Sequence, residues 1–116
     1  MNELIEQIFN NFIVPVSFLR YDGKATAYVT YQQTDIDNVL GADNGIINYV
    51  EYYDFDIYSK SNYTNIIEGV KRILTDNGFI WQPSRDSSDL YEDDTGYYHK
   101  TLSFAIERAN NSIRSA

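Results

Sequence analysis

Apolar side chains recur at helical spacing in two segments of the chain. The stripe Leu4, Ile5, Ile8, Phe9 and Phe12 predicts an amphipathic helix over residues 2–12. A second stripe predicts a helix over residues 61–77, made of Tyr63, Ile66, Ile67, Val70, Ile73 and Leu74. Ser59 or Ser61 can cap this helix, and Gly78 can end it in the left-handed conformation.

Two other segments alternate with the period of a strand. Within residues 49–58 one face carries Tyr49, Tyr53, Phe55 and Ile57, and the other carries Val50, Tyr52, Asp54, Asp56 and Tyr58. From Tyr97 onward an inward set, Tyr98, Lys100, Leu102, Phe104 and Ile106, alternates with Tyr97, His99, Thr101, Ser103 and Ala105. Residues 79–82 begin a shorter strand.

Turn-forming residues divide the rest of the chain. Asp22-Gly23 lies between residues 16–21 and 24–31 and predicts a hairpin with a type I′ turn. Residues 32–46 and 83–96 are polar and lack core anchors, so we expect two loops that are mobile in the isolated subunit. Residues 110–116 have no pattern and are expected to fray.

This order of elements predicts an α+β fold, in which one two-layer domain spans residues 1–116. The sheet is mainly antiparallel because strands that are neighbours in sequence can pair, and both helices pack on one of its faces. The expected core is Leu4, Ile8, Phe55, Ile66, Val70, Leu74, Leu102 and Phe104.

Composition excludes several classes of function. The chain has no cysteine, which excludes disulfides, thiolate catalysis and cysteine-ligated metals. The formal net charge of −8 disfavours binding to nucleic acid or to an anionic membrane. The first residues are acidic rather than basic, and no apolar run approaches the ~18 residues of a membrane span, so we expect a product of the cytoplasm.

Candidate chemistry is sparse, and the sequence predicts neither an enzyme nor a cofactor. His99 is the only histidine, and no orienting carboxylate or nucleophile stands out beside it. The acidic run 86–94 could gather oxygen ligands around Ca²⁺, but its spacing is not that of an EF-hand, and a solvated loop is the alternative. The six glycines form no phosphate-binding loop.

Tyrosine is the distinctive residue type, with 11 copies. Because adjacent residues of a strand face opposite ways, one member of each pair Tyr52-Tyr53 and Tyr97-Tyr98 lies on the sheet face that the helices leave open. Tyrosine suits a protein interface, since it combines contact area with a hydrogen-bonding tip, although such rings can also simply cover a sheet. The candidate interface comprises Tyr28, Tyr52, Tyr97 and His99, together with Tyr91 in the acidic loop.

Three stretches resemble the small tail-terminator or tail-completion proteins of long-tailed phages and prophages. They are residues 13–24 (IVPVSFLRYDGK), 27–31 (AYVTY) and 90–104 (LYEDDTGYYHKTLSF), of which the aromatic-His-Lys step into the last strand is the most specific. The acidic, serine-rich residues 86–89 depart from the family pattern.

The resemblance implies a virion protein at the head–tail junction, made in the host bacterial cytoplasm. It implies a non-enzymatic subunit of a homo-oligomeric ring, a hexamer, that caps the tail tube and docks on head connector proteins. DNA would meet the ring only in transit through its lumen. Two alternatives remain open: a connector component nearer the capsid, and a monomeric small-molecule or Ca²⁺-binding module that uses residues 86–94.

Overall fold

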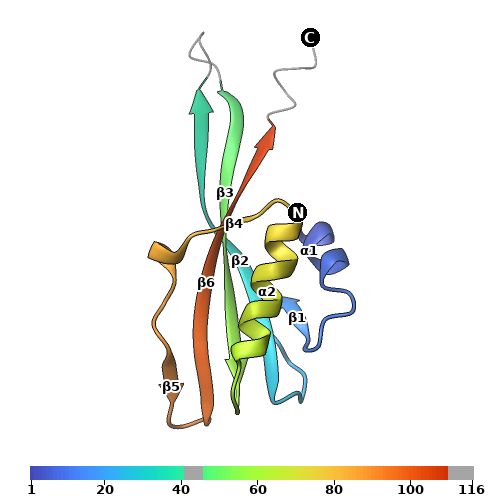
Figure 1. Ribbon diagram of the computed structural model, residues 1–116, viewed down its shortest axis with the longest axis vertical. Helices are drawn as coiled ribbons and strands as arrows, with labels where there is room; N and C mark the ends of the chain where they lie inside the picture. The colour runs from blue at the N-terminus through green and yellow to red at the C-terminus, as the bar shows by residue number, and fades with distance from the viewer. Residues whose placement is uncertain (41–45, 110–116) are drawn as a thin grey trace.

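The computed structural model describes residues 1–40 and 46–109, which form a two-layer α+β domain. Its helices are α1 (Asn2–Ile8) and α2 (Thr64–Asp76), with a 3₁₀ turn η1 (Pro83–Arg85). Its strands are β1 (Val16–Phe18), β2 (Ala27–Leu40), β3 (Ile46–Ser59), β4 (Ile80–Trp81), β5 (Leu90–Glu92) and β6 (Tyr97–Ala109). The strand order is β1-β2-β3-β6-β4, with β5 also on β6. Figure 1 shows both helices on one face of the sheet, as the sequence predicts.

The core lies between this face and the helices. Phe55, Ile66, Val70, Leu74, Leu102 and Phe104 are buried as predicted, and Leu4 and Ile8 pack at the margin. Helix α1 instead buries Ile5, and it ends at Ile8 rather than at residue 12, with the buried Phe9 just after it. Asn10 and Asn11 follow directly, and asparagine competes with the helix for backbone hydrogen bonds, which accounts for the early end.

The predicted hairpin at Asp22-Gly23 is wrong. Strand β1 runs parallel to β2, with Val16 opposite Val29 and Phe18 opposite Tyr31. A parallel return is possible because β1 has only three residues, so residues 19–26 can run back along it. Glycine is needed at position 23 because the Tyr21 side chain lies against its backbone, and not because of a type I′ turn. A Cβ there would lie 2.0 Å from the Tyr21 hydroxyl.

The predicted loop over residues 32–46 is largely strand. Strands β2 and β3 continue as an antiparallel ribbon from Ala27–Ser59 to Leu40–Ile46, with register shifts after Gln33 and after Val39. Aspartate and asparagine are tolerated here because the ribbon extends beyond the helices, where neither face needs to be apolar (Figure 1). Residues 41–45 of the predicted loop, like the predicted frayed tail 110–116, lie outside the described residues.

Gly78 ends α2 as predicted. Its φ of 90° lies in the left-handed region, and the Gly78 and Phe79 amides donate to Thr75 O and Leu74 O, at 3.3 and 3.0 Å. These two bonds form a Schellman motif. The predicted serine caps are wrong, because the helix begins after Tyr63 and Asn62 Oδ1 accepts the Thr64 amide at 2.9 Å.

The segment 83–96 is attached to β6 rather than free of anchors. The Gln82 and Ser87 amides donate to Ser103 O and Thr101 O at 2.8 and 3.0 Å, and β5 pairs with the start of β6. The outer edge of β6 has backbone N–H and C=O groups that need hydrogen-bond partners, and this segment supplies those partners. None of the described helices is long and apolar enough to cross a membrane.

Candidate protein-interaction face

The sheet face opposite the helices, here called the open face, is organised in cross-strand rows. Pairing of β2, β3 and β6 aligns Tyr28, Tyr58 and His99 in one row. The next rows are Thr30, Asp56 and Thr101, then Gln32, Asp54 and Ser103. Neighbours in a row lie close enough for their side chains to touch. The open face therefore has an aromatic end and an acidic middle.

The aromatic end is a continuous stack, here called the aromatic row, of Tyr21, Tyr28, Tyr58 and His99. Successive ring centroids are 4.6, 4.8 and 4.2 Å apart, with 28°, 21° and 18° between their planes. Tyr97 is the fifth ring of the aromatic row and packs edge-on, against Tyr28 at 5.6 Å and against Tyr58 at 6.3 Å. The Lys60 ammonium lies 5.1 Å from the Tyr97 ring centroid. Stacked and edge-on rings each add to stability beyond their buried area, so the row is a rigid surface.

His99 is held between two carboxylates. Its Nε2 lies 3.3 Å from Asp56 Oδ1, and its Nδ1 lies 3.7 Å from Glu92 Oε2. The same Asp56 oxygen accepts a hydrogen bond from the Thr101 hydroxyl. The sequence singled out no carboxylate for this histidine, yet β3 supplies one from the next row. The contacts fix the imidazole parallel to Tyr58 and so complete the aromatic row.

The Tyr28 and Tyr58 hydroxyls are protonated at neutral pH, as phenols are in water, and partial burial raises their pKa further. Desolvation, helped by the nearby Asp56 charge, raises the pKa of Tyr58 to about 12. Burial likewise raises the pKa of Tyr28, with smaller contributions from Tyr97 and Glu92. These phenols therefore offer hydrogen-bond donors at their tips, and the adjacent Asp54 and Asp56 offer acceptors.

Three of the five predicted interface residues meet in this row. Tyr28, Tyr97 and His99 lie together, whereas Tyr52 lies three rows away on the same face. The Arg85 guanidinium covers the Tyr52 ring at 4.2 Å, and the Tyr52 hydroxyl donates to Asp37 at 3.2 Å. Tyr52 therefore packs with Arg85 and Asp37 rather than with the aromatic row.

Tyr91 lies on the other side of the sheet. It is paired with Tyr98, with ring centroids 4.9 Å apart, and Tyr98 in turn lies 6.3 Å from Tyr63. The Tyr98 side chain lies on the helix side of the sheet, as the sequence predicts. It is 43% exposed because it precedes the part of β6 that α2 covers. In the pair Tyr52-Tyr53, Tyr53 is the buried member, and its position on the helix side of the sheet is predicted correctly.

Sequence reasoning missed Tyr21 and Tyr58 as members of the site. Tyr58 has the same parity as Tyr52, which places it on the open face, but only the β2–β3 register shows that it stacks on Tyr28. Tyr21 reaches the row because its segment folds back over Gly23 instead of forming a strand. No spacing in the sequence signals that fold.

The acidic run 86–94 does not converge on one point. Asp86 accepts the Ser103 amide and the Trp81 indole N–H, both at 2.8 Å. Asp89 accepts the Tyr63 hydroxyl, and Glu92 accepts the Thr95 hydroxyl at 2.9 Å. Over residues 1–40 and 46–109, no three acidic or histidine side chains gather as a metal site would require.

No family model matches the sequence, and no curated protein matches it.

Proposed function

We propose that this protein is a non-enzymatic tail-terminator or tail-completion subunit, which forms a ring on the end of a phage tail tube and joins it to the head connector. The observation that carries the proposal is the convergence of the three stretches that resemble that family. Tyr21 belongs to the first, Tyr28 to the second, and Tyr97 and His99 to the third. Residues separated by up to 78 positions thus meet in one stack.

The shape of the open face supports an assembly role. A sheet face covered by helices is a core, whereas a face with stacked tyrosines and no second layer of described residues suits contact with another protein. Its acidic middle, Asp54 and Asp56, favours a partner with basic side chains at the matching position. The tail tube or the connector is the partner we propose for this face.

The elongated outline also fits a subunit of an assembly. The described residues lie in a particle of 53 × 27 × 23 Å, and the β2–β3 ribbon projects beyond the helices (Figure 1). A projecting ribbon adds little to its own core, but it can reach a neighbouring subunit. The net charge of −8 would allow DNA to pass a ring lumen without adhering, because like charges repel.

Complementation of phage particles that lack this protein tests the proposal. The wild-type chain should restore joined particles with tails of uniform length, as seen by electron microscopy. Tyr28→Ala and Tyr97→Ala should fail, because they remove rings of the aromatic row. Tyr91→Ala, an exposed tyrosine on the opposite side, is the matched control and should complement. Normal tails and joined particles without the protein would overturn the proposed function.

A further inference from the structure

The two lateral edges of the sheet carry exposed apolar side chains. Strands β1 and β4 lie at opposite ends of the strand order. Beside β1, Ile13 is 65% exposed and Phe18 is 45% exposed, and on β4 Ile80 is 63% exposed. Single exposed apolar residues are ordinary, but here they gather at the two places where a sheet can meet another molecule.

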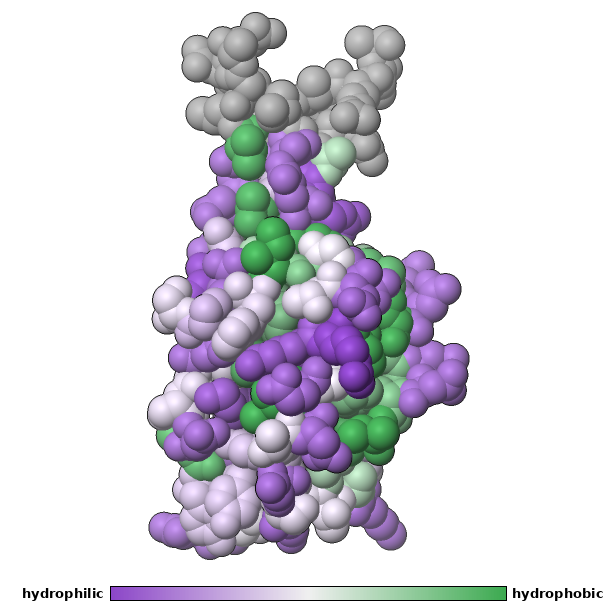
Figure 2. Space-filling view, in the orientation of Figure 1, coloured by the Kyte–Doolittle hydropathy of each residue, from purple (hydrophilic) through white to green (hydrophobic). Residues whose placement is uncertain are grey.

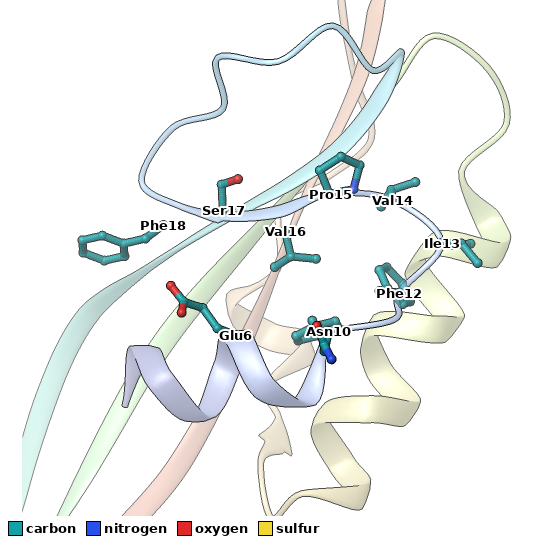
Figure 3. Close-up of a pocket in the computed structure, with 10 residues that line it drawn as sticks. Glu6, Asn10, Phe12, Ile13, Val14, Pro15, Val16, Ser17 and Phe18 are labelled. Carbon is teal, nitrogen blue, oxygen red and sulfur yellow. The ribbon is translucent and has the colours of Figure 1, made fainter.

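The β1 edge is hollowed by a groove between α1 and β1. The groove has a volume of about 610 Å³ and is lined by Phe9, Phe12, Val16 and Phe18, with Glu6 reaching in from the helix. In Figure 3 the Glu6 side chain rises from α1 toward the β1 segment, and the Val16 side chain points from β1 toward the helix. Figure 2 shows hydrophobic surface at the right margin of the molecule, over α1 and the segment that follows it. Asn10 and Ser17 also line the groove, so it combines apolar side chains with polar groups and one carboxylate.

A strained turn holds one end of this groove. Leu19 has a φ of 66°, and the Arg20 amide donates to Phe18 O at 2.8 Å, which closes a three-residue turn around Leu19. A leucine rarely adopts positive φ, and such strain persists where the surroundings require it and often marks functional sites. The turn leaves Phe18 and Leu19 exposed beside the groove.

The β4 edge presents a corner in which Trp81 lies beside a lysine, Lys71, and an aspartate, Asp86. Trp81 lies under the Lys71 ammonium of α2, which is 3.8 Å from the indole centroid. The indole N–H donates to Asp86 at 2.8 Å, so the ring is fixed. Trp81 is opposite Phe104, a core residue, which places the indole on the helix side of the sheet. The corner and the groove therefore lie in the same layer, at opposite edges.

We propose that the Trp81–Lys71 corner of one copy docks in the α1–β1 groove of a second copy, where Lys71 meets Glu6. A contact between two different patches of the same chain is heterologous, and heterologous contacts close into rings when the rotation between copies is right. Lys71 and Glu6 have opposite charges, and Phe9, Phe12 and Val16 of the groove offer apolar side chains to the indole. The closed ring rests on the proposed function, whereas the contact between copies does not.

The single tryptophan makes the contact directly observable. Trp81 is the only tryptophan, so its fluorescence should shift to shorter wavelength as protein concentration rises, in step with the mass measured by light scattering. Glu6→Lys should weaken self-association about tenfold or more, because it places two cations together. Lys71→Glu should do the same, and the double variant Glu6→Lys/Lys71→Glu should restore association. Lack of restoration in a double variant that remains folded would contradict the charge pairing.

Chemical cross-linking tests the geometry, because the natural chain has no cysteine. A variant with both Ile13→Cys and Thr75→Cys should give a ladder of covalent multimers with a short bis-maleimide, because Ile13 lines the groove and Thr75 is exposed one helical turn after Lys71. Either single variant should give no product larger than a dimer. The pair Ile13→Cys and Leu90→Cys is the matched control, since Leu90 is exposed on the same edge of β6 but outside the corner, and it should give no ladder.

The outcomes separate the two proposals. No ladder from the Ile13–Thr75 pair, whether the wild-type chain is an oligomer or stays a monomer at millimolar concentration, overturns the docking of the corner in the groove. A ladder from that pair in a protein that phage tails do not require keeps the docking and overturns the proposed function.

Discussion

His99 and Tyr58 stack across the β3–β6 pair, with ring centroids 4.2 Å apart and 18° between the planes. They are direct cross-strand partners, so the register of the sheet itself creates the contact. The imidazole is also held by Asp56 at 3.3 Å. The lone histidine therefore has a structural role in the aromatic row, and this role can be separated into stacking and hydrogen bonding.

We expect His99→Ala to destabilise the fold by about 0.5–1.5 kcal/mol, since it removes the stack on Tyr58. His99→Phe keeps an aromatic ring but cannot bond Asp56, so it should fall between wild type and His99→Ala. Urea unfolding of the two variants, and of a double-mutant cycle with Tyr58→Ala, measures the coupling. Additive effects of His99→Ala and Tyr58→Ala would show that the rings do not stabilise each other.

Leu102→Ala should cost about 2–4 kcal/mol through lost burial and the cavity left behind. Leu102 is fully buried beside Phe55 and Val70 in the core between α2 and the sheet. Leu90→Ala is the matched control, because Leu90 is exposed on β5, and it should change stability by less than about 0.5 kcal/mol. Equal effects on the urea midpoint would contradict this assignment of the core.

Gly78→Ala should destabilise the protein by about 1–2 kcal/mol, because its φ of 90° disfavours any Cβ. The site has space, since nothing lies within 4 Å of a Cβ built there, so the cost is conformational rather than steric. Gly78→Asn should cost less, because asparagine tolerates positive φ better. Thermal unfolding of the two variants gives the comparison, and an alanine variant as stable as wild type would contradict the Schellman ending.

The sequence predicted those elements whose own residues determine them. Helix α2 follows from six apolar residues at one spacing and from Gly78, and the buried face of β3 follows from Tyr53, Phe55 and Ile57. The β1–β2 arrangement could not be predicted, because Asp22-Gly23 has hairpin composition while the folding of Tyr21 over Gly23 decides the path. The β2–β3 ribbon was missed because its outer part is polar on both faces and so lacks the alternation that marks a half-buried strand.

The same distinction applies to the candidate site. Alternation placed Tyr28, Tyr97 and His99 on the open face, because parity is a property of each strand alone. Which of them share a row depends on register between strands distant in sequence, and a shift of one residue would have exchanged the faces. Tyr52 and Tyr91 were therefore grouped with residues that the fold places elsewhere.

Asp54→Asn should raise stability at neutral pH. Burial, with added repulsion from Asp56, raises the pKa of Asp54 above its usual 3.8. A carboxyl whose pKa is higher in the folded than in the unfolded state binds its proton more tightly when folded. Its contribution to stability is therefore fully present below pH 3.8 and is lost as pH rises through the folded pKa. At about pH 7 the charged carboxylate thus weakens the fold, and asparagine removes that charge.

The urea midpoint of Asp54→Asn should exceed that of wild type at about pH 7. The difference should shrink as the pH falls through the folded pKa of Asp54 and should be gone below pH 3.8. Asp94→Asn is the control, because it lowers the net charge equally from an exposed turn before β6. If both variants raise the midpoint by the same amount, general charge repulsion is the cause. A variant at Asp54 that is less stable at neutral pH would show that the carboxylate contributes a favourable contact on the open face, and that its acidic middle stabilises the isolated subunit.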